Sequence, residues 1–388
     1  SAASDVYKRQ LYKQVYEALR ESILRGEYAV GDRMPSEAEL SSRFDVSPIT
    51  IKRALDLLRT DGLIMRRPRI GTVVTSLTPT APQAPARAQN DADRSPSLIG
   101  CVITSFDDSF GNKVIEGILA ATGADTHVVF KRSGGDLADE DACIRALVGA
   151  GVEGLILLPS SSEYIPPAAL ELVAKKFPVV ILDRLFDGIP VSAVCSDNLA
   201  GGRAATEHLL DLGHKTIGFV SSTSHVSSSD DRRNGYIHAH ASNHLPLENS
   251  AELRTIGSTV PGSADTIEQD IARLVAFIEE HPDITGYVAA EYNIALMLRE
   301  ACHRLGLEVP ADISIVCFDH PDATFDTRLF RYTHIRQQQR TLGEKAVESV
   351  RRQISAPSEI EKVVLPTELI LGSSSACLLY TSPSPRDS

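Results

Sequence analysis

Residues 35–55, PSEAELSSRFDVSPITIKRAL, carry the signals of two short helices joined by a tight turn. Ser36 is followed three residues later by Glu39, which is the spacing of a capping box at a helix N-terminus. Ser47 and Pro48 are a typical N-cap and first residue of a second helix, because the N–H that proline lacks has no helical partner there. These residues predict a helix-turn-helix.

The second helix is predicted to bury one face and to present another to solvent. Its apolar residues repeat at i, i+4 and i+7 and form a stripe that faces a core: Ile51, Leu55 and Leu58. The residues that face outward near its N-terminus are hydroxylated or basic: Thr50, Lys52 and Arg53. Hydroxyl and N–H groups at a helix N-terminus bind phosphates, and longer side chains reach base edges. The pattern therefore favours insertion into the major groove of DNA.

The flanking segments predict a further helix and a basic hairpin. Residues 11–27 have an amphipathic pattern whose apolar side consists of Val15, Leu19, Ile23 and Leu24. Residues 63–65 and 72–74 are typical of short strands, and the turn between them is basic, with Arg66, Arg67 and Arg69. Three helices and a basic hairpin predict a winged helix-turn-helix over residues 11–75. The alternative is a small three-helix bundle with solvated charges.

These motifs resemble the GntR type of DNA-binding domain from end to end. The matching segments are 31–37 (GDRMPSE), 46–50, 57–64 and 71–74 (GTVV). Two positions depart from the family pattern. Where this chain has Ala38 the family often has Arg, and where it has Pro48 the family often has Arg or a polar residue. These departures imply a different operator sequence or fewer contacts with DNA. The resemblance and the outward faces together assign the following residues to DNA: Arg33, Ser36, Glu37, Ser47, Pro48, Ile49, Thr50, Lys52, Arg53, Arg67, Arg69 and Gly71.

The charge is divided unequally along the 388 residues. The net charge is −12, but residues 1–76 hold 13 Lys and Arg against 10 Asp and Glu, a net charge of +3, which leaves −15 for the remainder. A basic head on an acidic body directs DNA to the head and repels it from the body.

The composition also indicates the cellular compartment of the protein. The six cysteines are scattered without a CxxC pair, which predicts reduced core residues of a cytoplasmic protein. We expect no signal peptide, because the N-terminus lacks an apolar core, and no membrane span. The expected location is bacterial cytoplasm, with association to the nucleoid when the protein is bound to its operator.

Two kinds of segment are set apart from the domains. Residues 76–97 are rich in Pro, Ala and polar residues without apolar periodicity, and predict an interdomain linker. Residues 1–10 (SAASDVYKRQ) and 377–388 (CLLYTSPSPRDS) resemble translated adaptor sequence, so we expect non-native ends there.

Residues 98–372 predict an α/β body of two doubly wound lobes. Seven continuous apolar runs between residues 98 and 318 alternate with amphipathic helical patterns, which is typical of parallel sheets covered on both faces. The pattern restarts near Asp197. We therefore expect lobe 1 at 98–196 and 336–356, and lobe 2 at 197–335 and 357–372, with chain crossings near Ser196, Ile335 and Ala356. Ligands bind such sheets beyond the carboxyl ends of the strands.

The body resembles the LacI/GalR type of sugar-binding regulatory domain, which is similar to periplasmic binding proteins. The matching segments cover nearly all of it and include 152–156 (VEGLI), 179–184 (VVILDR), 208–217, 305–314 and 335–337 (IRQ). A GntR-type head on such a body resembles the arabinose-repressor subfamily. The predicted fold is therefore an N-terminal winged helix-turn-helix plus a two-lobed periplasmic-binding-protein-like domain.

The resemblance implies an effector cleft between the lobes. Its ligand set consists of an aromatic ring and groups able to form paired hydrogen bonds to sugar hydroxyls: Asp107, Asp108, Phe110, Arg184, Arg232, Glu291, Asp319 and Gln337. Glu291-Tyr292 replaces the family's usual Asn-Asp, which implies a ligand other than a simple neutral pentose. The serine-rich residues 221–229 are interpreted as a loop at the cleft edge, with a phosphate site as the alternative.

Catalytic and metal motifs give no competing assignment. The sequence has no G-x-x-x-x-G-K-[ST], G-x-S-x-G or H-E-x-x-H motif. His240 and His244 are spaced i, i+4 beside His238, but without an obvious carboxylate or Cys partner an exposed helix face is favoured over a metal site. We therefore predict no enzyme activity, no cofactor and no metal.

The function predicted from the sequence is a ligand-responsive transcription regulator, a repressor of carbohydrate genes. Its partners are double-stranded operator DNA, a small-molecule effector (a sugar or sugar derivative) and a second copy, in a homodimer formed through helices of lobe 1, with no membrane partner. The alternatives are an enzyme-like body or a constitutive docking body fused to the DNA-binding head. Ligand-dependent thermal stabilisation would distinguish a regulator from a constitutive body.

Overall fold

The computed structural model describes residues 2–67, 71–75, 97–105, 109–247, 251–321 and 328–378, and for residues 2–11, 60, 66–67 and 109–110 it describes the backbone alone. The predicted linker lies outside these residues except for Ser97, as do Arg69, Asp107 and Asp108. The chain divides into two units, residues 1–93 and residues 94–388, which are described separately below.

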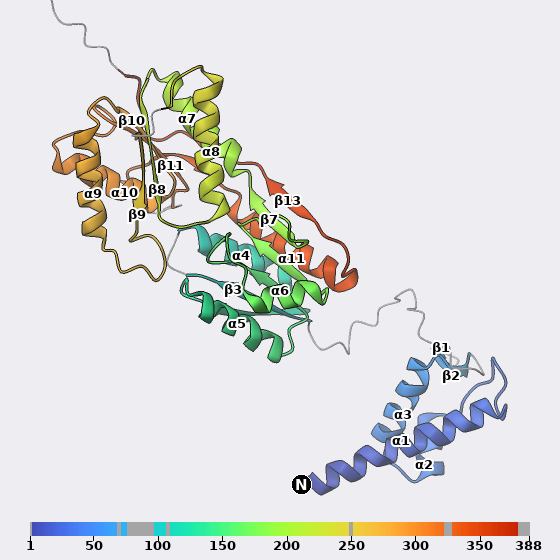
Figure 1. Cartoon of the computed structure of the whole chain (residues 1–388). Helices are drawn as coiled ribbons and strands as arrows, with labels where there is room; N and C mark the ends of the chain where they lie inside the picture. Colours follow the sequence, from blue (N-terminus) through green and yellow to red (C-terminus); the bar gives the residue numbers. More distant parts are fainter. Residues whose placement is uncertain are drawn as a thin grey trace, which may run out of the picture. The chain divides into compact units, whose positions relative to one another are not determined.

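The first unit is a winged helix-turn-helix, as predicted (Figure 1). Its three helices are α1 (Ala2–Leu24), α2 (Glu37–Phe44) and α3 (Pro48–Thr60). Strands β1 (Ile64–Arg67) and β2 (Gly71–Val74) pair antiparallel and form the wing.

Local capping signals begin both helices of the predicted pair. Ser36 Oγ accepts from the N–H of Glu39 while Glu39 Oε2 accepts from the N–H of Ser36 at 2.7 Å, so the predicted capping box is confirmed. Ser47 Oγ accepts from the N–H of Thr50, and Pro48 occupies the first turn. Asp45 ends α2 in the left-handed conformation, with φ of 50°.

The core of this unit joins all three helices to the wing. Ile51, Leu55 and Leu58 are buried as predicted, together with Val15, Leu19 and Ile23 of α1. Leu24 was expected on the buried side of the first helix, and that expectation is wrong: its side chain is 38% exposed. The reason is that Val15, Leu19 and Ile23 repeat every four residues along one side of α1, whereas Leu24 lies about 100° further round the helix than Ile23.

The second unit contains two six-stranded sheets, each covered on both faces by helices (Figure 1). The first sheet is parallel throughout. In spatial order it consists of β13 (Lys362–Leu365), β7 (Ser192–Ser196), β6 (Val179–Leu182), β5 (Gly154–Leu157), β3 (Ser97–Ile103) and β4 (Thr126–Arg132). One face packs on α4 (Ser109–Thr122) and α11 (Gln339–Ser355), and the other on α5 (Leu137–Gly149) and α6 (Pro167–Ala174).

The second sheet is parallel except for its last strand. In spatial order it consists of β14 (Glu368–Ile370), β12 (Thr333–Arg336), β11 (Ser314–Phe318), β10 (Gly286–Ala289), β8 (Ile217–Ser222) and β9 (Glu252–Ile256), with β14 antiparallel to β12. One face packs on α9 (Ile267–Glu280) and α10 (Tyr292–Arg304), and the other on α7 (Asn198–Asp211) and α8 (Ser227–Ser242).

The third chain crossing lies later than predicted. Residues 357–372 were all expected in lobe 2, but β13 pairs with β7 in the first sheet, so Lys362–Leu365 belong to lobe 1. The chain crosses to the second sheet only between Leu365 and Glu368, not near Ala356. The segment instead forms the edge of the first sheet through its parallel pairing with β7.

The body also extends beyond residue 372. Ser374 is fully buried, donates to the carbonyl of Ile315 at 2.5 Å and accepts from the N–H of Thr333 at 2.8 Å. Within the segment expected to be foreign, the N–H of Leu378 donates to the carbonyl of Leu212 at 3.0 Å. In the same way, α1 begins at Ala2, inside the other segment expected to be non-native.

One histidine prediction is corrected by the packing. His240 was assigned to an exposed helix face, but it is only 4% exposed and its ring lies edge-on to Tyr236 with 4.4 Å between ring centroids. Its Nδ1 lies 2.9 Å from the Tyr236 carbonyl, whereas His238 and His244 are exposed. In the described part of the chain, no group of three or more His, Cys, Asp or Glu is arranged to hold a metal ion.

Candidate functional site

The N-terminus of α3 presents a continuous exposed surface in the first unit. Ser47, Pro48, Lys52 and Arg53 are exposed, and Thr50 is half-buried. Ile49 is 69% exposed, although it is a large apolar residue next to a well-filled core. An apolar side chain at such a position can contact a thymine methyl group in the major groove.

Arg33 lies against the wing. It pairs with Val73 of β2 in an isolated bridge, and its Nε lies 3.1 Å from where a Cβ at position 71 would be. Gly71 has φ of +105°, so a larger residue would be strained there and would meet the guanidinium. Ser36 and Glu37 lie at the adjoining N-terminus of α2. The side chain of Arg67 and the whole of Arg69 lie outside the described residues.

A cleft of about 530 Å³ lies between the two sheets of the body and is lined by residues of both lobes. Five of the eight residues predicted for a ligand line it: Arg184, Arg232, Glu291, Asp319 and Gln337. Asp107 and Asp108 lie outside the described residues. Phe110 is the second residue of α4, but its side chain is not described.

Arg232 is a buried cation held by three other segments. Its Nε donates to Asn198 Oδ1 at 2.8 Å and its Nη1 donates to the Ala290 carbonyl at 2.7 Å, while its guanidinium carbon lies 4.1 Å from the centre of the Phe318 ring. Burial lowers the pKa of Arg232, against the opposing effect of nearby carboxylates. Gly202 of α7 allows α8 to approach closely, because a Cβ there would lie 2.1 Å from the Arg232 carbonyl oxygen.

Asp319 follows β11 directly and is held between two amides. Gln337 Nε2 donates to its Oδ2 at 2.6 Å and Gln339 Nε2 donates to its Oδ1 at 2.8 Å. Burial raises the pKa of the Asp319 carboxyl, and the charge of Arg232 opposes this rise. Asp319 has φ of +62°, an unusual conformation for a residue other than glycine.

Asp183 occupies the matching place in the first lobe, directly after β6, with φ of +58°. Its carboxylate pairs with Arg184, and Arg184 Nη1 reaches across the cleft to Ser228 Oγ at 2.8 Å. Asp183 Oδ1 and Arg184 Nε are buried with no hydrogen-bond partner among the described residues. Sequence reasoning missed Asp183, although its position at the end of a buried strand was the available signal.

Glu291 lies among hydroxyl groups in the second lobe. Ser222 Oγ donates to Glu291 Oε1 at 2.8 Å and lies 2.8 Å from Ser224 Oγ. Ser228 and Ser229 also line the cleft, and Ser227 begins α8. The serine-rich segment therefore lies at the cleft, and its hydroxyls can both donate and accept.

The cleft contains hydrogen-bond donors and acceptors close to one another. Its lining carries charges of both signs, with the guanidinium groups of Arg184 and Arg232 and the carboxylates of Asp183, Glu291 and Asp319. Such a set binds ligands with closely spaced hydroxyl groups, because each hydroxyl donates one hydrogen bond and accepts others. Within the described ranges, no helix is long and apolar enough to cross a membrane.

Two protein families match separate parts of the chain. Residues 11–74 match bacterial regulatory proteins of the gntR family, and residues 206–375 match the periplasmic binding protein-like domain. With the winged helix and the two-lobed body, these matches define the class: the chain is a DNA-binding transcription regulator that joins a gntR-type head to a periplasmic-binding-protein-like body.

Individual relatives match the chain over most of its length. The chain is 27% identical over 372 residues to the arabinose metabolism transcriptional repressor of Geobacillus stearothermophilus, covering 94% of this chain and 97% of that protein. It is 25% identical to the ribose operon repressor of Haemophilus influenzae, covering 76% of this chain and 84% of that protein. The fold is similar to that of a LacI family transcriptional regulator from Enterococcus faecium with bound ribose, with a TM-score of 0.61 and 23% identity over 73% of this chain and 100% of that chain.

Proposed function

We propose that the protein is a repressor of carbohydrate-utilisation genes that binds operator DNA as a homodimer and responds to a sugar or sugar derivative in the interlobe cleft. The observation that carries the proposal is the convergence of Arg184, Arg232, Glu291 and Asp319 on one cleft, from both lobes. The relatives' names support a carbohydrate effector, because they are repressors of arabinose and ribose genes.

The DNA-binding part of the proposal rests on the exposed N-terminus of α3 and on Arg33 beside the wing. A single winged helix reads only a short half-site, whereas a two-fold dimer reads two half-sites and gains specificity. We therefore propose a homodimer formed through helices of the first lobe. Operator binding would place the protein on the nucleoid.

Effector control follows from the two-lobed body. A ligand in the cleft contacts both lobes only when they are closed, so it stabilises the closed state by its differential affinity. Closure would alter the arrangement of the two bodies in the dimer and, through residues 76–97, the placement of the two heads on their half-sites.

The test combines thermal denaturation with operator binding in the full chain. A panel of monosaccharides, sugar acids and disaccharides is screened for an increase in melting temperature, and each hit is added to a gel-shift titration with operator DNA. We expect one or a few saccharides to stabilise the protein and to change its operator affinity. Stabilisation by no saccharide would contradict the carbohydrate proposal and favour a constitutive body.

A further inference from the structure

A second contact between the lobes lies far from the chain crossings. The crossings follow β7, β12 and β13, which lie at or next to one edge of each sheet. The strands at the opposite edges are β4 and β9. The turn after β4 contains Gly134 and Gly135, and the loop after β9 contains Pro261 and Gly262. Rotation about the crossings displaces these outer edges most, so a contact between them depends most strongly on closure.

The two segments touch, and position 135 has no room for a side chain. A Cβ at position 135 would lie 2.6 Å from the Pro261 carbonyl oxygen and 2.8 Å from the Pro261 Cβ. A Cβ at position 262 would lie 3.5 Å from the Gly134 carbonyl oxygen. These segments also line the cleft on both sides. The contact therefore forms the outer wall of the cleft when the lobes are in this arrangement.

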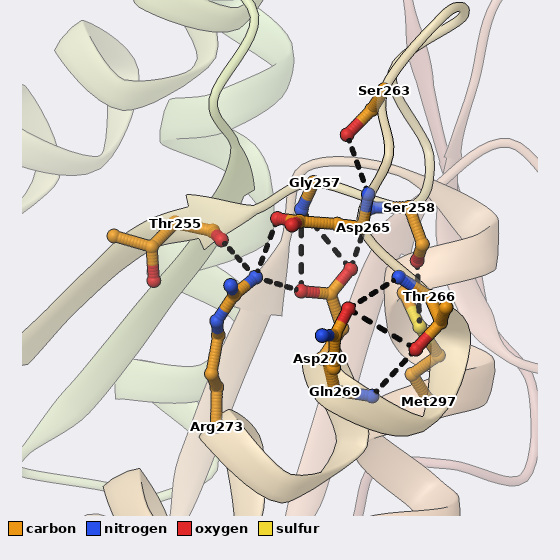
Figure 2. Close-up of polar contacts among 10 residues, drawn as sticks. All are labelled: Thr255, Gly257, Ser258, Ser263, Asp265, Thr266, Gln269, Asp270, Arg273 and Met297. Atoms are coloured by element: carbon orange, nitrogen blue, oxygen red, sulfur yellow. Dashed lines mark hydrogen bonds and ion pairs between the residues drawn. The ribbon is translucent and has the colours of Figure 1, made fainter.

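The loop from Gly257 to Asp265 is bound at both ends to α9 (Figure 2). Asp270 is fully buried and accepts from the N–H of Gly257 at 3.0 Å and from the N–H of Ser258 at 2.7 Å. Arg273 Nη1 binds Asp270 at 2.6 Å and Asp265 at 2.8 Å, so the beginning and the end of the loop are tied to the same guanidinium.

The electrostatics of this anchor favour its charged form. Burial alone raises the pKa of the Asp270 carboxyl, but the hydrogen bonds from Ser258, Gly257 and Arg273 outweigh burial and the pKa is lowered. Figure 2 shows Arg273 pointing at both carboxylates and at the Thr255 carbonyl, which it reaches at 3.1 Å. Both ends of the loop are thus tied to α9 on the side of the second lobe.

We infer that Gly135 and Pro261 form a latch that determines effector size, a role that rests on the proposed carbohydrate effector. With the latch closed, the cleft ends at Pro261 and accepts a compact ligand of monosaccharide size. A longer saccharide that extends past this wall must hold the latch open and forgo full closure. Gly135 is then a specificity-determining residue, although its side chain offers no group to the ligand.

A matched pair of variants isolates the contact. Gly134 and Gly135 both have positive φ, +66° and +86°, so alanine is strained at either position. Only at position 135 does the added Cβ meet Pro261, because a Cβ at position 134 has nothing within 4 Å. We expect Gly135→Ala to reduce the ratio of monosaccharide to disaccharide affinity by about tenfold, or about 1.4 kcal/mol, relative to Gly134→Ala. Equal ratios in the two variants, measured by calorimetry on the full chain, would overturn the specificity role.

A crosslink tests the latch without any ligand. The double variant Gly135→Cys/Pro261→Cys should form an intramolecular disulfide on oxidation. The two Cβ atoms would lie 2.8 Å apart, so the segments need to move apart by only about 1 Å to reach disulfide distance. Peptide mapping identifies the bond and distinguishes it from bonds to Cys143 or Cys377. Failure to crosslink overturns the latch whatever the effector is. Crosslinking in a protein that no saccharide stabilises supports the latch and contradicts the carbohydrate proposal.

Discussion

Replacing Asp319 with asparagine should separate effector binding from stability. The carboxylate accepts hydrogen bonds from Gln337 at 2.6 Å and from Gln339 at 2.8 Å. Asparagine keeps one acceptor. The glutamine that faces the new NH2 group can turn its amide and accept a hydrogen bond with its Oε1. That oxygen is free to do so, because it has no partner among the described residues in either Gln337 or Gln339. The internal network should therefore lose no more than about 1 kcal/mol, the worth of one ordinary hydrogen bond.

The sign of the pH effect follows from burial. Because burial raises the pKa of Asp319 in the folded protein, its charged form lowers stability above the pKa of the unfolded chain. This loss is relieved as pH falls through the raised pKa. Asp319→Asn should thus melt at the same temperature as the wild type or higher at pH 7, and any difference should shrink as pH is lowered.

Effector binding by Asp319→Asn should be weaker than by the wild type, although its stability should be kept or increased. A hydrogen bond between a ligand hydroxyl and a charged carboxylate contributes about 1.5–3 kcal/mol. Its loss corresponds to about ten- to 150-fold weaker binding, since each 1.4 kcal/mol is tenfold. Operator binding without effector should be unchanged, because Asp319 belongs to the body.

The assay is an operator gel shift across an effector titration, with melting curves from pH 5 to 8. Asp230→Asn is the matched control, because Asp230 is exposed on α8 and pairs with Arg254 at 3.1 Å outside the cleft. If Asp319→Asn responds at the same effector concentration as the wild type and the control, Asp319 does not bind the effector.

Three other predictions concern DNA binding, the loop anchor and assembly. Lys52→Ala should weaken operator binding by about 1–3 kcal/mol, because a base contact is lost. Arg67→Ala should weaken binding to all DNA sequences alike and reduce the salt dependence of binding. Both are measured by gel shift at two salt concentrations, and unchanged affinity in both variants would contradict the assignment of α3 as the recognition helix. Asp270→Ala should lower the free energy of unfolding of the body by about 2–4 kcal/mol, because two backbone N–H groups lose their acceptor. Glu268→Ala, which breaks an exposed ion pair on the same helix, should have little effect in the same denaturant titration, and equal losses would refute the role of the anchor. Sedimentation of the full chain at micromolar concentration should give twice the chain mass, and a single-chain mass would contradict the dimer.

The sequence alone determined the head and the type of body. Capping boxes, N-cap serines and an i, i+4, i+7 stripe depend on residues within one or two turns of each other, so Ser36, Ser47 and Ile51 were assigned correctly from their spacing. Continuous apolar runs likewise predicted β3, β4, β5, β6, β8, β10 and β11, but not β7 and β12, which also lie inside the sheets. The edge strands β9, β13 and β14 lacked such runs, because they are partly exposed.

Only the tertiary structure decided what those elements bring together. The segment containing β13 was expected in lobe 2, and its pairing with β7 places it in lobe 1. The bond from Arg184 to Ser228 spans 44 residues and joins two lobes. The approach of Gly135 to Pro261 joins the outer edges of two separate sheets. No local pattern encodes such pairs, because they depend on strand order and on how far the lobes close, and both are set by packing across the whole body.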